Sequence, residues 1–161
     1  MSDSFKTCPP LLIQFTNQSI NSVDEFWDFG DSTATDVHNP SHFYTYPGVY
    51  TITLSAKGPG GCVNKTQKQI VVKGPQGSIN YVPLSLCKPY QVNFVAHSSN
   101  SVSHIWDFND GVTVSSIDTT ISHTYQDSGK FIPKIILIDD KGCKVPVTGK
   151  DTLTNIFTNT A

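Results

Sequence analysis

A five-residue pattern occurs twice in this chain, and the repeat to which it belongs sets the size of the folding unit. Residues 27–31 are Trp-Asp-Phe-Gly-Asp, and residues 106–110 are Trp-Asp-Phe-Asn-Asp. Two copies of about eighty residues account for the 161-residue chain. Each copy is long enough to bury its own small core and too long for most solenoid repeats. The sequence therefore predicts two domains, residues 1–74 and 75–161.

The flanking residues recur in the same order. From His42 onward the spacing between copies is two residues longer, which places a two-residue insertion between Asp110 and His123. That stretch is polar and suits a loop. The matched pairs are Cys8 and Cys87, Pro10 and Pro89, Phe15 and Phe94, His42 and His123, Tyr44 and Tyr125, Gly48 and Gly129, Tyr50 and Phe131, and Cys62 and Cys143.

The composition excludes several classes of protein. Hydrophobic residues make up 37% of the chain and charged residues only 15%, which suits short strands joined by turns. A net charge of -2 without a basic run offers no electrostatic footprint for nucleic acid or an anionic membrane. No apolar stretch is long enough to span a bilayer, and the first residues lack the apolar core of a signal peptide. We expect a monomeric fragment, whose export signal lies elsewhere if the protein is secreted.

Alternation of apolar and polar residues predicts strands throughout, and no segment has a helical period with caps. Trp27 and Phe29 share one face of their strand. Residues 33–41 are expected to be a loop or a weak edge strand, and residues 73–77 a very short linker. The strands are expected at 11–16, 23–29, 42–46, 49–56 and 66–73, and again at 90–96, 102–108, 121–125, 130–138 and 150–157.

This order of strands, with a tryptophan positioned for burial in each copy, is typical of an immunoglobulin-like fold. The fold class expected is all-β, with two immunoglobulin-like antiparallel β-sandwich domains in tandem. Trp27 and Trp106 could in principle stack on sugar rings, but core packing is the preferred interpretation.

The four cysteines fall two per copy, at matching places. Four cysteines allow three connectivities, and the one that treats both copies alike joins Cys8 to Cys62 and Cys87 to Cys143. Free buried thiols and a metal site are the alternatives, although no two cysteines have the close spacing of a zinc site. Disulfides would indicate an extracytoplasmic compartment.

The chain resembles the polycystic kidney disease (PKD) domain family over nearly its whole length. Two features depart from the family pattern in the second copy, namely Asn109 in place of Gly30 and Pro133 within a strand. Asn tolerates a left-handed conformation, and Pro133 should make its strand an edge or bulged one. The resemblance rests on Trp27, Asp28, Phe29, Asp31, His42, Tyr44 and residues 47–54, and on Trp106, Asp107, Phe108, Asp110, His123, Tyr125 and residues 129–131.

The resemblance implies a seven-stranded sandwich that serves as an extracellular spacer or binding module. Domains of this kind look like those in large cell-surface adhesins of Bacteroidetes-type bacteria. The expected partners are neighbouring domains of the same chain, and a polysaccharide or a surface protein is an open alternative.

The carboxylates of Asp28, Asp31, Asp107 and Asp110 are the candidate site residues. Each pair flanks a tight turn, where carboxylates accept backbone N–H bonds, and this structural interpretation is preferred over a calcium site or catalysis. His42 and His123 are interpreted as imidazoles at the edge of the core. No nucleophile, phosphate-binding or metalloprotease motif occurs, so we expect no enzyme and no cofactor.

Overall fold

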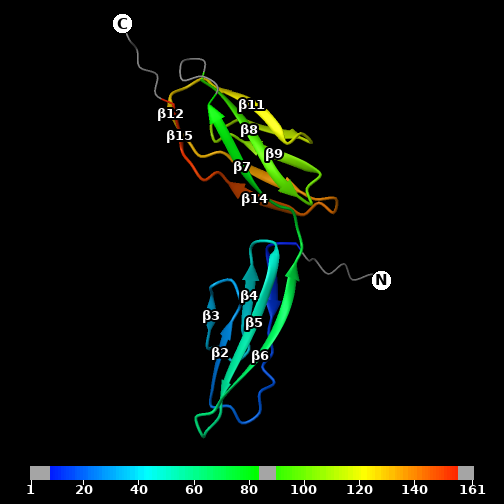
Figure 1. Cartoon of the computed structure of the whole chain (residues 1–161), viewed down its shortest axis with the longest axis vertical. Coiled ribbons are helices and arrows are strands. Elements are labelled where there is room, and N and C mark those ends of the chain that lie inside the picture. Colours follow the sequence, from blue (N-terminus) through cyan, green and yellow to red (C-terminus); the bar gives the residue numbers. More distant parts are fainter. Residues whose placement is uncertain (1–7, 84–89, 156–161) are drawn as a thin grey trace. The chain divides into compact units, whose positions relative to one another are not determined.

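The structure is a computed structural model that describes residues 8–83 and 90–155, with the side chain of Asn155 left out. It contains two compact units, Met1–Lys73 and Gly74–Ala161, each built from antiparallel strands (Figure 1). Among the described residues there is no helix that could cross a membrane. The all-β class and the two tandem immunoglobulin-like sandwiches are confirmed.

The first unit has a two-stranded sheet, β1-β4, facing a four-stranded sheet, β3-β2-β5-β6. The longest pairing joins β5 to β6 along ten residues each. The strands are β1 (Leu11–Gln14), β2 (Asp24–Asp28), β3 (Ala34–Thr35), β4 (Ser41–Tyr44), β5 (Gly48–Lys57) and β6 (Val63–Val72).

The second unit has sheets of order β10-β9-β13-β14, β11-β8-β7 and β12-β15. The strands are β7 (Gln76–Pro83), β8 (Tyr90–Ser99), β9 (Ser103–Asp107), β10 (Thr113–Ser116), β11 (Thr120–Tyr125), β12 (Gly129–Phe131), β13 (Lys134–Ile138), β14 (Lys144–Thr148) and β15 (Leu153–Asn155).

Proline explains the main difference between the two units. The single strand expected at 130–138 is broken at Ile132-Pro133, and its halves join different sheets. Proline has no N–H for a ladder, so the continuous β5–β6 hairpin of the first unit becomes two short pairings in the second.

Three strands of the second unit were not predicted. β7 occupies part of the expected linker, β10 forms in the polar insertion, and β14 precedes the strand expected at 150–157. The alternation in β7 is weak because Gly77 and Pro83 interrupt it. Segment 33–41 does contain a weak edge strand, β3, as expected.

Each unit has its own core around its tryptophan. Trp106 is fully buried, and Trp27 is 6% exposed. The first core contains Trp27, Phe29, Tyr44, Ile52 and Val72, and the second contains Ile79, Tyr90, Val92, Phe94, Ala96, Trp106, Phe108, Tyr125, Ile135, Leu137 and Leu153.

The cysteine pairing expected in the first unit is wrong. Cys62 is a free, exposed thiol, whereas Cys8 and Cys143 are each disulfide-bonded. Leu11, just after Cys8, pairs with Tyr44 beside the start of β5, while Cys62 lies beyond the other end of that strand. A ten-residue strand is about 30 Å long, and disulfides join Cα atoms within about 7 Å. Cys87 lies outside the described residues.

Candidate functional site

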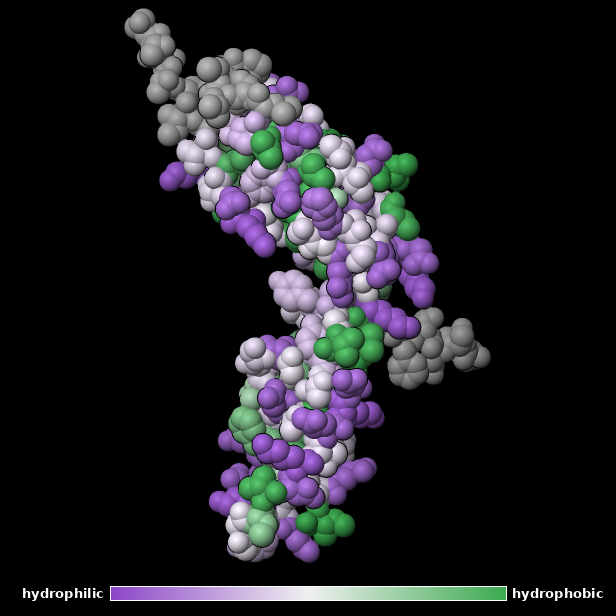
Figure 2. All heavy atoms as spheres, viewed as in Figure 1, coloured by the Kyte–Doolittle hydropathy of each residue, from purple (hydrophilic) through white to green (hydrophobic). Residues whose placement is uncertain are grey.

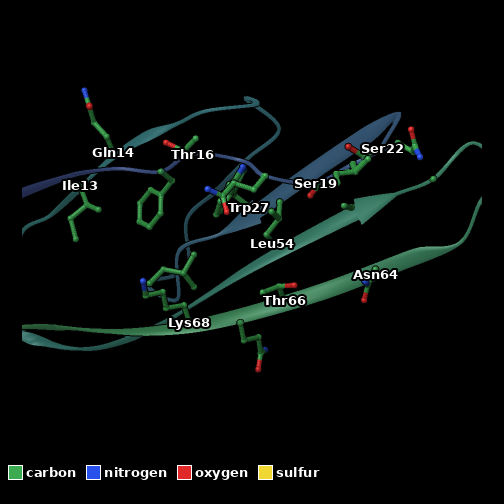
Figure 3. Close-up of a pocket in the computed structure, with 18 of the residues that line it drawn as sticks. Ile13, Gln14, Thr16, Ser19, Ser22, Trp27, Leu54, Asn64, Thr66 and Lys68 are labelled. Carbon is green, nitrogen blue, oxygen red and sulfur yellow. The ribbon is translucent and has the colours of Figure 1, made fainter.

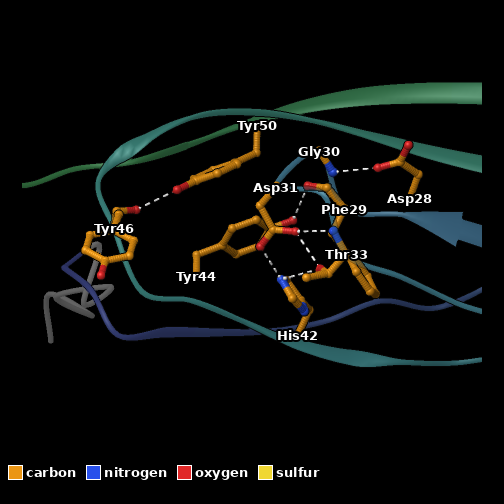
Figure 4. A network of polar contacts seen from close by, with 9 residues as sticks. All are labelled: Asp28, Phe29, Gly30, Asp31, Thr33, His42, Tyr44, Tyr46 and Tyr50. Carbon is orange, nitrogen blue, oxygen red and sulfur yellow. Dashed lines mark hydrogen bonds and ion pairs between the residues drawn. The ribbon is translucent and has the colours of Figure 1, made fainter.

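The repeated pentapeptide forms a tight turn after β2 that places two carboxylates. Asp28 accepts a hydrogen bond of 2.9 Å from the backbone N–H of Gly30, and Asp31 accepts one of 3.1 Å from Thr33. The N–H of Phe29 donates to the carbonyl of Thr33, which closes the turn. The two aspartates therefore hold the turn, as Figure 4 shows.

The same turn is tied to β4 by a histidine and a tyrosine. Oδ2 of Asp31 lies 2.7 Å from Nε2 of His42. The imidazole stacks on Phe29 with ring centroids 4.1 Å apart, and the Tyr44 ring meets it edge-on at 4.8 Å. The Tyr44 hydroxyl donates to the carbonyl of Phe29. This group joins the turn after β2 to the two-stranded sheet across the core (Figure 4).

The second unit repeats this network. Asp110 and His123 are 2.6 Å apart, the imidazole stacks on Phe108 at 3.9 Å, and Tyr125 donates to the Phe108 carbonyl. Asp107 accepts the backbone N–H of Asn109 at 2.9 Å. Two copies with different neighbours build the same contacts, so the contacts belong to the module.

The electrostatics of the network favour a charged aspartate and neutral tyrosines. Burial raises the pKa of Asp31, but hydrogen bonds from Thr33 and His42 outweigh it and leave the pKa below its ordinary value. Burial raises the pKa of Tyr44 to about 12 and raises that of Tyr125 as well. Both hydroxyls therefore stay protonated and keep donating to their carbonyls at neutral pH.

An Asp–His pair resembles part of a catalytic relay, but the hydroxyl nearest to the first pair, that of Thr33, is engaged by Asp31. Nε2 of His42 faces Asp31 and lies 3.4 Å from the hydroxyl of Thr33, which itself contacts Asp31. Catalysis by such a pair requires a nucleophile within reach of the base. The contacts drawn in Figure 4 instead satisfy the polar groups of a turn.

A calcium site at Asp28 and Asp31, or at Asp107 and Asp110, remains the alternative use of these carboxylates. Within residues 8–83 and 90–155 no group of three or more His, Cys, Asp or Glu is placed to hold a metal ion. Several of the carboxylate oxygens are engaged with backbone N–H groups. Thermal melting with calcium and with a chelator tests the alternative.

The first unit contains a groove that the sequence analysis missed. It has a volume of about 810 Å³ and lies between the segment 13–22 and β6. Ile13, Trp27 and Leu54 form its floor, while Thr66 and Lys68 line its β6 wall (Figure 3). Comparison of the two copies could have indicated the groove. Asn64 and Thr66 occupy the positions at which the second copy has the apolar residues Val145 and Val147.

Both units expose apolar side chains among the described residues. On the face shown in Figure 2 they occur in small groups among hydrophilic side chains in both units. Small exposed apolar groups of this kind are common on protein surfaces.

Comparison with known proteins identifies the repeated unit. The family described as the PKD domain matches residues 10–73 and again residues 84–154, which confirms the resemblance drawn from the sequence. The chain is also 36% identical over 75 residues to the protein named Collagenase ColA of Bacillus cereus. That match spans 43% of this chain and only 8% of the collagenase.

Proposed function

Because this chain belongs to the PKD domain family and carries two tandem copies, we propose that it is a non-catalytic spacer and interaction segment. It serves within a longer secreted or cell-surface adhesin and contributes to surface attachment or gliding motility. PKD domains are modules of longer chains, and the Asp–His networks in both copies are suited to holding turns.

The direction of the strands in the second unit carries this proposal. The chain enters at Gln76, which pairs with Ser99 at one end of β8. It leaves through β15, which pairs with β12 just after Tyr125, and Tyr125 pairs with Tyr90 at the other end of β8. A pull on the two ends therefore runs along the strands and loads many β7–β8 hydrogen bonds together.

The first unit is threaded differently over its described residues. β1 begins at Leu11, beside Tyr44, and β6 ends at Val72, beside Gly48. The chain thus enters and leaves near the same end, and tension along the described chain does not run lengthwise through this unit. Over the described residues, lengthwise loading is therefore a property of the second unit.

An extracellular location is part of this proposal. Cys8 and Cys143 are disulfide-bonded, and disulfides persist mainly in oxidising compartments. The location is tested by treating intact cells of the source organism with a protease that cannot cross membranes. Loss of the intact protein supports the proposal, and protection until the cells are lysed contradicts it.

Single-molecule stretching of the 161-residue chain tests the mechanical role. Asn80 is exposed in the middle of β7, so Asn80→Pro should remove a ladder bond with little effect on the core, and Asn80→Ala is the control. We expect the proline variant to unfold at a clearly lower force than the control. Equal unfolding forces would show that β7 does not carry the load.

The second candidate is an accessory module that delivers a hydrolase to a polysaccharide or a protein polymer. The similarity to part of a protein named a collagenase favours it. Sedimentation of the chain with insoluble polysaccharides and with fibrous proteins separates the two candidates. Saturable binding to either material supports the accessory role, and absence of binding to all of them supports the spacer.

A further inference from the structure

Two equivalent turns of the chain each carry a cysteine, and the two cysteines are in different chemical states. In the turn before β6, Gly58 donates to the carbonyl of Cys62 at 2.9 Å, and Gly61 donates to that of Gly58. In the turn before β14, residues 139–143 form the same pair of bonds. Cys143 is buried and disulfide-bonded, whereas Cys62 is an exposed free thiol. The same turn thus holds its sulfur against a partner sulfur in one copy and in solvent in the other.

Exposed aliphatic side chains lie around the Cys62 thiol. Val23 donates its backbone N–H to the carbonyl of Lys57, and Lys57 pairs with Val63, so the loop before β2 lies beside the turn. The side chains of Ile20, Val23 and Val63 are all more than half exposed. Hydrophobic side chains are visible at this end of the first unit in Figure 2. We call these three side chains and Cys62 the tip of the first unit.

The segments that form the tip are uncharged. Residues 16–23 and 58–64 contain no Asp, Glu, Lys or Arg. Asp24 and Lys57, which flank them, pair across the sheet with opposite signs. The equivalent turn of the second copy has two aspartates and a lysine at 139–141. Two tips of the first unit can therefore approach each other without bringing like charges together, and each offers the other an apolar surface and a thiol.

We propose that two copies of this chain join tip to tip through a disulfide between their Cys62 residues. A two-fold axis sets each tip against an identical one, so that aliphatic side chains meet aliphatic side chains and the two sulfurs face each other. A Cβ at Gly61 would meet no atom within 4 Å, so the unit's own atoms leave the approach to Cys62 open. A tip of four side chains is small beside the roughly 20–30 residues a side of a stable interface, so the bond holds the dimer together.

The bond forms by exchange with a small-molecule disulfide, the class of oxidant that an oxidising compartment supplies. The Cys62 thiolate of one copy attacks this disulfide, whose S–S bond breaks to release one small thiolate and leave the other half on Cys62. The Cys62 thiolate of the second copy attacks the Cys62 sulfur of that mixed disulfide and displaces the remaining half. The two protons of the cysteine thiols pass to the two released thiolates. Two cysteine thiols are oxidised, and one small disulfide is reduced to two thiols.

The inference rests on the proposed function only for these oxidising surroundings. Within a surface-attachment protein, a joined pair of chains carries twice the attachment sites of one chain, and linked sites bind with higher avidity than separate ones.

Oxidation of the purified 161-residue chain with oxidised glutathione tests the proposal. Non-reducing electrophoresis should show most chains as dimers, and mass spectrometry should find the peptide joined through Cys62 of both copies. Cys62→Ser should stay monomeric, and a reducing agent should return the dimer to monomer. A chain that stays monomeric, with or without a glutathione adduct, would overturn the proposal, as would a bond from Cys62 to any other cysteine. Because the oxidant is supplied, such a failure leaves the extracellular location to its own protease test.

A pair of lysine variants separates contact between tips from the chemistry of the thiol. Val63 belongs to the tip, whereas Val49 is similarly exposed at the other end of β5. Val63→Lys sets two lysines face to face, so dimer formation should slow about tenfold or more relative to alkylation of Cys62 by uncharged iodoacetamide. Val49→Lys should leave this ratio unchanged. Equal ratios for both variants and the unmodified chain would mean that the thiols meet at random, and they would overturn the contact.

Discussion

The carboxylate of Asp110 lies 2.6 Å from Nε2 of His123, and both side chains are more than four-fifths buried. Each module thus has a polar contact between the turn of its repeated pentapeptide and the strand that carries both its histidine and its tyrosine, β4 or β11. The Asp31–His42 pair of the first module has nearly the same separation. The contact fixes the stacked ring below it, and its consequences for stability can be measured.

Acid should destabilise the first module through Asp31. The pKa of Asp31 is lowered from its ordinary value of 3.8, so its charged form stabilises the folded state above that pH. This stability should be lost as the pH falls through 3.8 and below. Urea denaturation between pH 7 and pH 2.5 should show a smaller acid-dependent loss for Asp31→Asn than for the unmodified chain. Identical pH profiles would contradict the assignment.

The buried tyrosine hydroxyls should contribute through their hydrogen bonds. Tyr44→Phe and Tyr125→Phe each leave a backbone carbonyl, of Phe29 or Phe108, without its donor. We expect a loss of about 1–2 kcal/mol in the free energy of unfolding of the affected module. Tyr46→Phe is the control because Tyr46 is 61% exposed. A neutral effect at Tyr44 would show that water replaces the hydroxyl.

Replacement of the two tryptophans by alanine should lower the free energy of unfolding by different amounts. Trp106→Ala leaves a closed cavity and should cost about 3–5 kcal/mol. Trp27 lines the open groove, so water can enter the space left by Trp27→Ala, and the cost should be lower, roughly 1–3 kcal/mol. Denaturation monitored separately for each module by NMR measures both. A larger loss at Trp27 would mean that the groove is closed in solution.

Gly30 and Asn109 occupy equivalent positions but should not be interchangeable. Both have positive φ, yet a Cβ at Gly30 would lie 2.7 Å from the backbone oxygen of Thr51. Gly30→Asn should therefore destabilise the first module by roughly 1–3 kcal/mol. Asn109→Gly should change stability by less than about 1 kcal/mol. Thermal unfolding of both variants provides the comparison.

The free thiol of Cys62 gives a direct chemical test. In the native, unreduced chain an aromatic disulfide reagent should react with Cys62, and Cys62→Ser should lower the number of reacting thiols by one without changing the melting temperature. Cys8 and Cys143 should not react before reduction, because both are disulfide-bonded. A lower melting temperature for the serine variant would indicate a Cys62 disulfide after all.

Local patterns singled out the residues of the network and a histidine bonded to a neighbouring turn, but not that the turn's second aspartate is the partner of that histidine. The repeat and the strand parity single out the aspartates, histidines and tyrosines, because each depends on its position in a short segment. The Cys62 pairing failed because it depends on which end of a ten-residue strand each cysteine occupies. The broken strand at Pro133 was foreseen as an edge or bulge, but the change of sheet was not.

The sequence by itself determined two copies of one β-sandwich module, since repetition, alternation and turn residues act over a few positions. Only the tertiary structure decided that the second module encloses its tryptophan with β7 while the first leaves a groove along β1. In the second module β7 pairs with its neighbour β8 and also contacts β13 and β14, which lie far along the chain. Strand pairing is set by the free energy of assembling whole sheets. The residues of one short segment do not determine that free energy.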